Sequence, residues 1–339
     1  MTVVPSLLSM LSGIKLRDLR LTDYSRAALK RTLKAAEYYL EIYRNSLEIA
    51  LERCPVPLEK ATVVDFGGGH GLLSVLAKMS GVGRVIYVDT NPDAVHTAHQ
   101  LSQKLGAAPD VFLQGSSGGL LRWCRDNEVC PDALLAMDVI EHVYVLDEFF
   151  ADLHTISPTM KMVFTTASTP YNKRVVRRLH QAMEADELGT TTKKGFWQMR
   201  REYIQKLHPD MPDSQLDYWA DNTRGLRYED VARAVEAQSP NLLLDPHNTC
   251  DPATGSWTER ILPVEDYRQL LSPYGYGLEV LPGHYNEHRH GPKAIASRHY
   301  NKIIGMAPKG TPSGFRQRRR YRKALKVAPF LYFVVEGNR

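Results

Sequence analysis

The stretch Val63-Val64-Asp65-Phe66-Gly67-Gly68-Gly69-His70-Gly71-Leu72-Leu73-Ser74 decides the fold that we expect for this chain. Its apolar start predicts a buried strand, its glycines predict a tight turn, and residues 72–79 favour a helix. A strand, a glycine turn and a helix in this order let the backbone approach a ligand and aim a helix N-terminus at it. Position 72 is Leu, so the dinucleotide-binding spacing G-x-G-x-x-G is not met.

Composition indicates an ordinary globular protein. The 339 residues, 43% of them hydrophobic and 24% charged, are enough for one large domain or two modest ones. The four cysteines form no C-x-x-C pair, which argues against a zinc knuckle or a redox motif. Residues 1–13 are apolar without a basic leader, and the apolar run 327–335 is too short to cross a bilayer. We therefore expect a reduced, cytoplasmic protein without a membrane span.

Strands and helices are predicted to alternate from Ala61 to Ser168, which favours a doubly wound parallel sheet. Two later strands are predicted after a long interruption. The expected strands are 61–67, 84–90, 109–115, 131–138, 160–167, 278–286 and 329–336. Ligands of such sheets bind outside the carboxyl ends of the strands, so polar residues at those ends are the candidate site.

Acidic residues follow two of these strands. Asp89 ends the second, about 20 residues past the glycines, where a carboxylate can accept hydrogen bonds from ribose hydroxyls or cap the next helix. Asp138 ends the fourth, within Asp138-Val139-Ile140-Glu141-His142-Val143. The glycine turn preceded by Asp65 resembles motif I of the class I S-adenosylmethionine-dependent methyltransferases. The D-V-I-E-H-V run resembles a signature of their ubiquinone-biosynthesis-type group (methyltransferase type 11/23).

The resemblance covers roughly residues 60–170 and 258–336. It implies an α/β fold with a doubly wound, mostly parallel seven-stranded sheet, the last two strands forming an antiparallel edge pair, and S-adenosyl-L-methionine as the cofactor. Many relatives carry an acid beside the adenine after the third strand, where this chain has Ser116, so adenine contact through that loop is open. The expected cofactor-binding residues are Asp65, Gly67, Gly68, Gly69, Gly71, Asp89, Thr90, Ser116, Ser117 and Asp138.

The domain organisation expected from the sequence has three parts. Residues 1–58 form an N-terminal helical segment with a helix over 22–53, and residues 59–170 and 258–339 form the methyltransferase core. Residues 171–257 leave from the carboxyl end of the fifth strand and contain predicted helices at 173–187, 196–208 and 226–238. This insertion is interpreted as a lid or substrate-recognition region, with an oligomerisation surface as the competing interpretation.

Histidines and basic residues supply further candidates. His142, with Glu141 orienting it or capping the next helix, is the candidate general base, although His142 packing beneath that helix is an equally simple interpretation. Asp138, Glu141 and His142 would begin the metal set of some relatives, but residues 257–260 offer no histidine, so metal-independent transfer is expected. The other histidines considered, predicted to lie in a polar loop near the sixth strand, are His284, His288, His290 and His299.

Basic residues cluster at 173–178 and 316–326. They indicate either contacts with phosphate groups or a solvated helix face. The predicted function is O-methylation of a small molecule or glycan, with anionic acceptors included. The alternatives are a non-catalytic S-adenosylmethionine-binding protein and an RNA methyltransferase, although no RNA-binding module is recognised, so nucleic acid is a minority interpretation. A homo-oligomer is compatible with the sequence.

Overall fold

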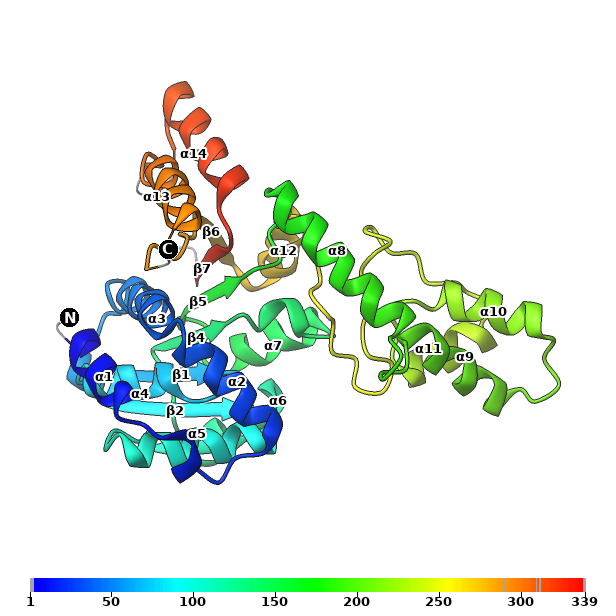
Figure 1. The fold of residues 1–339 in the computed structure, drawn as a ribbon, viewed down its shortest axis with the longest axis horizontal. Helices are drawn as coiled ribbons and strands as arrows, with labels where there is room; N and C mark the ends of the chain where they lie inside the picture. The colour runs from blue at the N-terminus through cyan, green and yellow to red at the C-terminus, as the bar shows by residue number, and fades with distance from the viewer. Residues whose placement is uncertain (1–2, 289–290, 309, 311, 338–339) are drawn as a thin grey trace. The chain divides into compact units, whose positions relative to one another are not determined.

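A computed structural model of the protein describes residues 3–288, 291–308, 310 and 312–337 (Figure 1). The chain forms two compact units. The first contains Met1–Val139, Asp147–Thr166 and Arg268–Arg339, and the second contains Ile140–Leu146 and Ala167–Tyr267. Each unit is described by itself.

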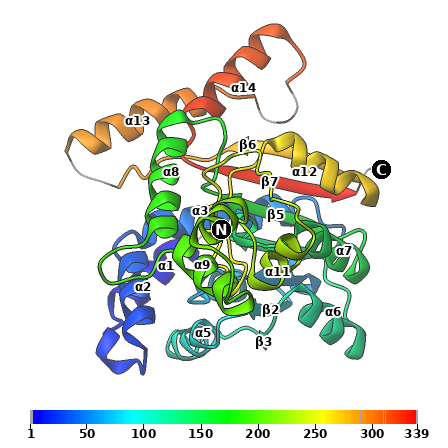
Figure 2. The same ribbon diagram turned by 90° about the vertical axis from the view of Figure 1, so that its right-hand side faces the viewer.

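The first unit is built on one seven-stranded sheet with the order β3-β2-β1-β4-β5-β7-β6 (Figures 1 and 2). β1 to β5 pair in parallel, and β7 is antiparallel to both β5 and β6. Each strand overlaps its predicted range, and the predicted fold class is confirmed. The strands are β1 Thr62–Phe66, β2 Arg84–Asp89, β3 Val111–Gln114, β4 Ala133–Met137, β5 Lys161–Thr166, β6 Tyr276–Pro282 and β7 Leu331–Gly337.

Both faces of this sheet are covered, because alternate side chains of a strand point to opposite faces. On one face Val63, Val85 and Val163 pack against α3 and α4 in a single buried cluster. On the other face the aromatic ring of Phe164 contacts that of Phe150 on α7. Continuous apolar strands such as residues 133–136 are therefore explained by burial on both sides.

The helices outside the second unit's core are numerous and mostly short. They are α1 Val3–Ser12, α2 Asp23–Leu33, α3 Ala36–Leu51, α4 Leu72–Met79, α5 Pro92–Lys104, α6 Ser117–Asp126, α7 Leu146–Ile156, α12 Val264–Leu271, α13 Pro292–Ile304 and α14 Phe315–Val327. Short 3-10 turns lie at Leu16–Asp18, Leu58–Lys60, Ile140–His142 and Ser272–Tyr274. Among the described residues, no helix combines the length and apolar character needed to cross a membrane.

Two helix predictions need correction. The single helix expected over 22–53 is two helices, because Ala35 between them leaves the helical region with φ −130° and ψ 30°. Neither glycine nor proline marks this break, so hydrophobic spacing alone gives no sign of it. His299 was expected in a polar loop but lies in α13, whereas His284 and His288 lie in the loop after β6. His290 lies outside the described residues.

The second unit is helical, as predicted for the insertion. It contains α8 Lys173–Leu188, α9 Phe196–Leu207, α10 Asp213–Asn222 and α11 Tyr228–Glu236, of which α10 was not predicted. Ile204, Leu216 and Trp219 form a buried cluster with Val231 and Val235. This unit therefore has an apolar core of its own.

A buried ion pair crosses the second unit. Arg200 is fully buried and its guanidinium pairs with the carboxylate of Glu187. The Nε of Arg200 also donates to the carbonyl oxygen of Ala220 at 3.0 Å, and the Thr249 hydroxyl donates to Glu187 at 2.6 Å. A buried charge is tolerated only when it is paired and hydrogen-bonded, so these groups specify how the helices meet.

Arg200→Ala should destabilise the second unit strongly, since it leaves the Glu187 carboxylate buried without its main partner. Removing one member of a buried pair costs about 3–5 kcal/mol, and the low end is expected here. The reason is Arg224, whose Nε lies 4.0 Å from the same carboxylate. Urea unfolding followed by circular dichroism measures the change. The control is Arg201→Ala, which removes solvent-exposed ion pairs to Asp213 and Asp217 and should change stability little. Equal losses in the two variants would contradict this account.

Candidate active site

The glycine turn leaves β1 in a conformation that requires glycine. Gly67 has φ 67°, in the left-handed region, and its N–H donates to the carbonyl oxygen of Val88 at 2.7 Å. A Cβ on Gly67 would lie 2.4 Å from a methyl of Val139. The turn is therefore pressed between β2 and the segment that follows β4.

The other glycines of the turn permit close packing or leave open space. A Cβ on Gly71 would lie 2.8 Å from the Cβ of Ala98 on α5, and a Cβ on Gly68 would meet the ring of Tyr87 at 2.6 Å. At Gly69 an added Cβ would have no atom within 4 Å. The turn is thus packed on the protein side at Gly68 and Gly71 and open at Gly69.

Asp65 acts inside the protein in this structure. Its side chain is buried, and its Oδ2 accepts hydrogen bonds from the Ser74 N–H at 2.9 Å and the Ser74 hydroxyl at 2.7 Å. Burial raises the pKa of Asp65 to about 7, although the two bonds from Ser74 oppose that change. Its contacts with Ser74 hold α4 against β1, and the cofactor-binding role expected for Asp65 stays a prediction.

Asp89 lies at the carboxyl end of β2, beside the open part of the turn. Its Oδ2 accepts a hydrogen bond from the Gly69 N–H at 3.0 Å, and its Oδ1 accepts one from the Asn91 N–H at 2.8 Å. Burial raises the pKa of Asp89, while backbone hydrogen bonds from Asn91, Gly69 and Thr90 lower it. Asp89 therefore binds the glycine turn and also occupies the end of β2 where a ribose is expected.

Ser116 and Ser117 follow β3, as predicted. Ser116 is the residue before α6, and the hydroxyl of Ser117 donates to Asp152 of α7 at 2.6 Å. The position where relatives carry an acid therefore begins a helix here.

Asp138 comes directly after β4 and has φ 53°, which is unusual for a residue other than glycine. Its N–H donates to the carbonyl oxygen of Thr165 at 3.0 Å, and the Thr165 hydroxyl lies 3.4 Å from its Oδ1. Such backbone strain, on the order of 1–3 kcal/mol, tends to occur at functional sites. The conformation marks Asp138 as a residue held in place at this edge.

Sequence reasoning missed one residue close to these acids. Burial, followed by the charges of Asp138 and Asp65, raises the pKa of Tyr43 on α3. The phenol of Tyr43 therefore lies near both carboxylates. The run Tyr38, Tyr39 and Tyr43 at helical spacing was the available signal, since aromatic residues on one helix face often line a pocket.

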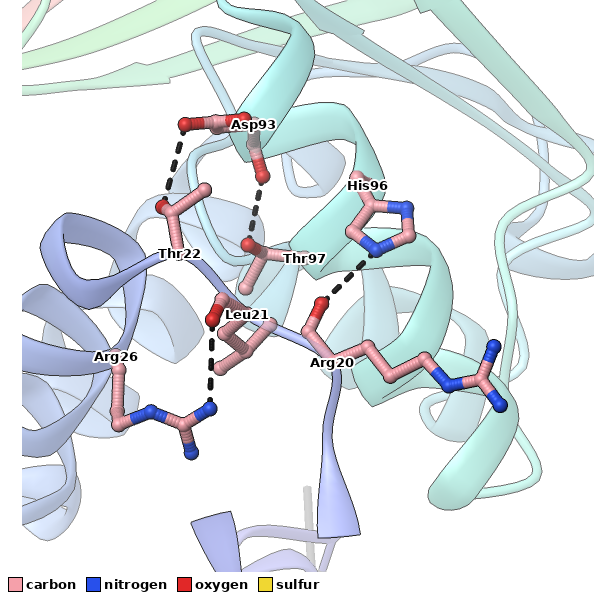
Figure 3. A pocket seen from close by; sticks show the side chains of 7 residues that line it. All are labelled: Arg20, Leu21, Thr22, Arg26, Asp93, His96 and Thr97. Atoms are coloured by element: carbon pink, nitrogen blue, oxygen red, sulfur yellow. Dashed lines mark hydrogen bonds between the residues drawn. The ribbon is translucent and has the colours of Figure 1, made fainter. Parts of the chain in front are cut away.

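A pocket of about 470 Å³ lies between the segment before α2 and the first turns of α5 (Figure 3). The Thr22 hydroxyl donates to Asp93 at 3.2 Å, and a ring nitrogen of His96 lies 3.0 Å from the carbonyl oxygen of Arg20. These bonds tie the N-terminal segment to the helix that follows Asp89.

The candidate catalytic residues Glu141 and His142 belong to the second unit. Glu141 is fully buried, and its Oε1 accepts a hydrogen bond from the Ala167 N–H at 3.1 Å. Nδ1 of His142 lies 2.7 Å from the carbonyl oxygen of Trp257. Because a carbonyl only accepts, Nδ1 carries the proton, and in the neutral ring the lone pair is on Nε2.

The predicted site residues therefore fall into two groups. The carboxyl edge of the first unit's sheet brings together Asp65, Gly67, Gly68, Gly69, Gly71, Asp89, Thr90, Ser116, Ser117 and Asp138. Glu141 and His142 lie in a 3-10 turn of the second unit, beside the 257–260 segment. A cofactor edge and a candidate base are thus assigned to different units.

One group of possible metal ligands occurs among the described residues, in the second unit: His180, Asp245 and His247. A ring nitrogen of each histidine lies within 3.2 Å of an Asp245 carboxylate oxygen. The two rings stack 3.8 Å apart and 6° from parallel. A metal ion lies in the plane of each imidazole that binds it, so these parallel rings would have to rotate to share one ion.

Known proteins are similar in sequence to this chain only over short stretches. No protein-family model matches the chain. It is 46% identical over 67 residues to the ribosomal protein L11 methyltransferase of Burkholderia mallei, 20% of either chain. The corresponding protein of Anoxybacillus flavithermus is 36% identical over 95 residues, 26% of this chain and 30% of that one. The chain thus spans less than a third of the length of the curated relatives it matches.

Two solved structures were found among those similar to this chain. One is a putative sarcosine dimethylglycine methyltransferase from Galdieria sulphuraria, at 10% identity and a TM-score of 0.42, covering 99% of this chain and 98% of that one. The other is the cyclopropane synthase MmaA2 from Mycobacterium tuberculosis, at 12% identity and a TM-score of 0.40, covering 86% and 83%.

The strand order, the antiparallel β7 and the glycine turn after β1 are those that the resemblance to the class I S-adenosylmethionine-dependent methyltransferases implies. The ubiquinone-biosynthesis-type subgroup stays a prediction. The carboxyl edge fits S-adenosylmethionine, the cofactor that the same resemblance implies. Gly69 leaves room for a ligand against the backbone, and the Asp89 carboxylate offers acceptor oxygens next to it.

Asp89→Ala should weaken S-adenosylmethionine binding about 10- to 150-fold, the equivalent of about 1.5–3 kcal/mol for lost hydrogen bonds to a charged group. Titration calorimetry should find micromolar affinity for the unmodified protein and no binding of NAD. Asp93→Asn is the matched control, because its side chain binds Thr22 instead. Full affinity in Asp89→Ala would remove the ribose assignment.

The raised pKa of Asp65 predicts a pH-dependent stability. A carboxyl with a raised pKa binds its proton more tightly in the folded state, so stability falls as pH rises from about 4 to the folded pKa of about 7. Asp65→Asn keeps an oxygen acceptor for Ser74 and should remove this fall, whose slope is at most about 1.4 kcal/mol per pH unit. Urea unfolding between these pH values tests it, with exposed Asp126→Asn as the control. A slope unchanged in Asp65→Asn would contradict the prediction.

Proposed function

We propose that this protein transfers the sulfonium methyl group of S-adenosylmethionine to an oxygen atom of a small molecule or glycan. The observation that carries the proposal is the open glycine turn at Gly69, with the Asp89 carboxylate bonded to it at the carboxyl ends of β1 and β2. This is the edge at which open α/β sheets bind ligands. Asp138 is held at the neighbouring strand end.

When bound, S-adenosylmethionine supplies an activated methyl group and leaves as S-adenosylhomocysteine after its carbon–sulfur bond breaks and the carbon–oxygen bond forms. The protein's part is chiefly positioning, since the acceptor oxygen must approach in line with that bond. Asp89 and the backbone of the turn fix the cofactor. The resemblance to the class I methyltransferases implies that Asp138 lies near the methionine end of the cofactor, and the Asp138 N–H donates to both the carbonyl oxygen and the hydroxyl of Thr165.

His142 is the proposed general base. Its Nδ1 is bonded to the Trp257 carbonyl, so Nε2 is the nitrogen that accepts the acceptor's hydroxyl proton. An imidazole nitrogen with a lone pair can accept a proton, which suits this role. Glu141, buried and bonded to the Ala167 N–H, fixes the turn that carries His142.

The inserted region 171–257 is proposed to recognise the acceptor. It starts directly after β5, and the first turns of α8 present four exposed cations, Lys173, Arg174, Arg177 and Arg178. Such a group favours an acceptor that carries anionic groups. An assembly surface is the competing role. Light scattering of the protein with residues 171–257 deleted would then show a changed number of chains in each particle.

A protein acceptor is the second candidate, because the chain's short identities are to ribosomal protein L11 methyltransferases. Transfer of labelled methyl from S-adenosylmethionine to size-separated fractions of a cell extract distinguishes the acceptors. Label in the small-molecule or glycan fraction is the expected result. Label in protein or RNA would show that the acceptor belongs to that class instead. If no fraction yields S-adenosylhomocysteine, the protein binds the cofactor without catalysis.

His142→Ala should lower turnover about 10²- to 10⁴-fold, the usual effect of removing a general base, while cofactor affinity stays unchanged. The loss should shrink as pH rises above the pKa of the acceptor hydroxyl, which then ionises without help. His208→Ala, another histidine of the second unit, is the control. Near-native turnover of His142→Ala at neutral pH would transfer the role to Tyr171, to His284 or to solvent.

A further inference from the structure

The helices α13 and α14, inserted between β6 and β7, carry a concentrated positive charge. No Asp or Glu occurs between Glu287 and Glu336, and this interval contains 12 Lys and Arg residues. The rest of the chain has 31 basic and 38 acidic residues, a net charge of −7. The net charge of +5 for the whole protein is therefore the sum of a strongly cationic segment and an acidic remainder.

The cations of α14 are exposed, and five of them share one helix face with Phe315. Positions 315, 318, 319, 322, 323 and 326 recur at helical spacing and line a groove of about 500 Å³. The opposite side holds the helix in place: Ala324 and Leu325 are buried, and the Tyr321 hydroxyl donates to the carbonyl oxygen of Val280 on β6 at 2.6 Å. Within the described part of the chain, none of the α14 cations forms an ion pair with an acid.

Large apolar side chains are exposed on the same element. Phe315 at the start of α14 is 82% exposed, Ile295 on α13 is 65% exposed, and Met306 after α13 is 50% exposed. α13 packs against α14, so the exposed apolar and cationic side chains belong to one hairpin of helices, labelled in Figures 1 and 2. Exposed apolar groups among cations are typical of surfaces that bind membranes.

The hairpin also starts at the functional edge of the sheet. β6 and β5 are both antiparallel to β7, so β6 ends at the edge where β1 and β5 end. That edge carries the glycine turn and Asp138. The hairpin is therefore joined to the sheet at the edge that carries the candidate cofactor site.

We propose that the α13–α14 hairpin docks the protein on an anionic phospholipid surface. The cations of α14 meet lipid phosphates, and Phe315, Ile295 and Met306 enter the boundary between head groups and acyl chains. A hydrated polyanion such as RNA would satisfy the cations but would leave Ile295 and Met306 in water. This is why a bilayer is favoured over nucleic acid. The docking does not depend on methyl transfer.

Flotation of the full chain with vesicles tests the proposal. The protein should float with vesicles of phosphatidylcholine containing about 30% phosphatidylglycerol, not with phosphatidylcholine alone, and should be released as salt rises from about 0.1 to 0.5 M. Arg318→Gln/Arg322→Gln/Lys326→Gln should lower the partition coefficient about 100-fold, since each cation near such a surface contributes a factor of about five. The control is Lys15→Gln/Lys30→Gln/Lys34→Gln, an equal loss of exposed charge elsewhere that should leave flotation unchanged.

Phe315→Ser separates lipid from nucleic acid. On vesicles it should lower partitioning about tenfold, because it removes a side chain that enters the bilayer. Circular dichroism should show each variant folded. Three results would each overturn the proposal. The first is absence of flotation at low salt, and the second is an equal loss in the two triple variants. The third is tighter binding to single-stranded RNA, with no effect of Phe315→Ser on vesicles.

Discussion

The two hydrogen bonds from Ser74 to the buried carboxylate of Asp65 are the interaction on which the site depends. They join the first turn of α4 to β1 across the glycines, so the backbone between them has fixed ends. The Tyr87 hydroxyl, bonded to the Gly69 carbonyl at 2.7 Å, and Asp89, bonded to the Gly69 N–H, hold its middle. The result is a preorganised turn whose open position is next to a carboxylate, which lowers the cost of ordering a ligand.

The two units provide partners for their buried polar groups in different ways. The first unit places carboxylates at strand ends, where backbone N–H groups are free to bond them. The second unit buries an Arg200–Glu187 pair among its helices and adds a 3-10 turn that fixes the protonated nitrogen of His142.

Charge is distributed unevenly along the chain. The carboxylates of the candidate cofactor edge belong to the part of the chain with a net negative charge, whereas the interval that contains α13 and α14 has 12 basic residues and no acidic one. The placement of the cationic hairpin between β6 and β7 follows from the antiparallel edge pair, which returns the chain to the functional edge of the sheet.

The sequence by itself determined the sheet, the glycine turn and the strand-end acids, because apolar runs, glycines and their spacing are local signals. It did not mark the break at Ala35, the helix containing His299 or the role of Tyr43, since each depends on neighbours distant in sequence. Only the tertiary structure decided that Asp65 bonds Ser74 inside the protein. It likewise decided that the His142 tautomer is fixed by the Trp257 carbonyl, 115 residues away. Hydrogen-bond partners and desolvation are set by the packed neighbours, and no local pattern encodes them.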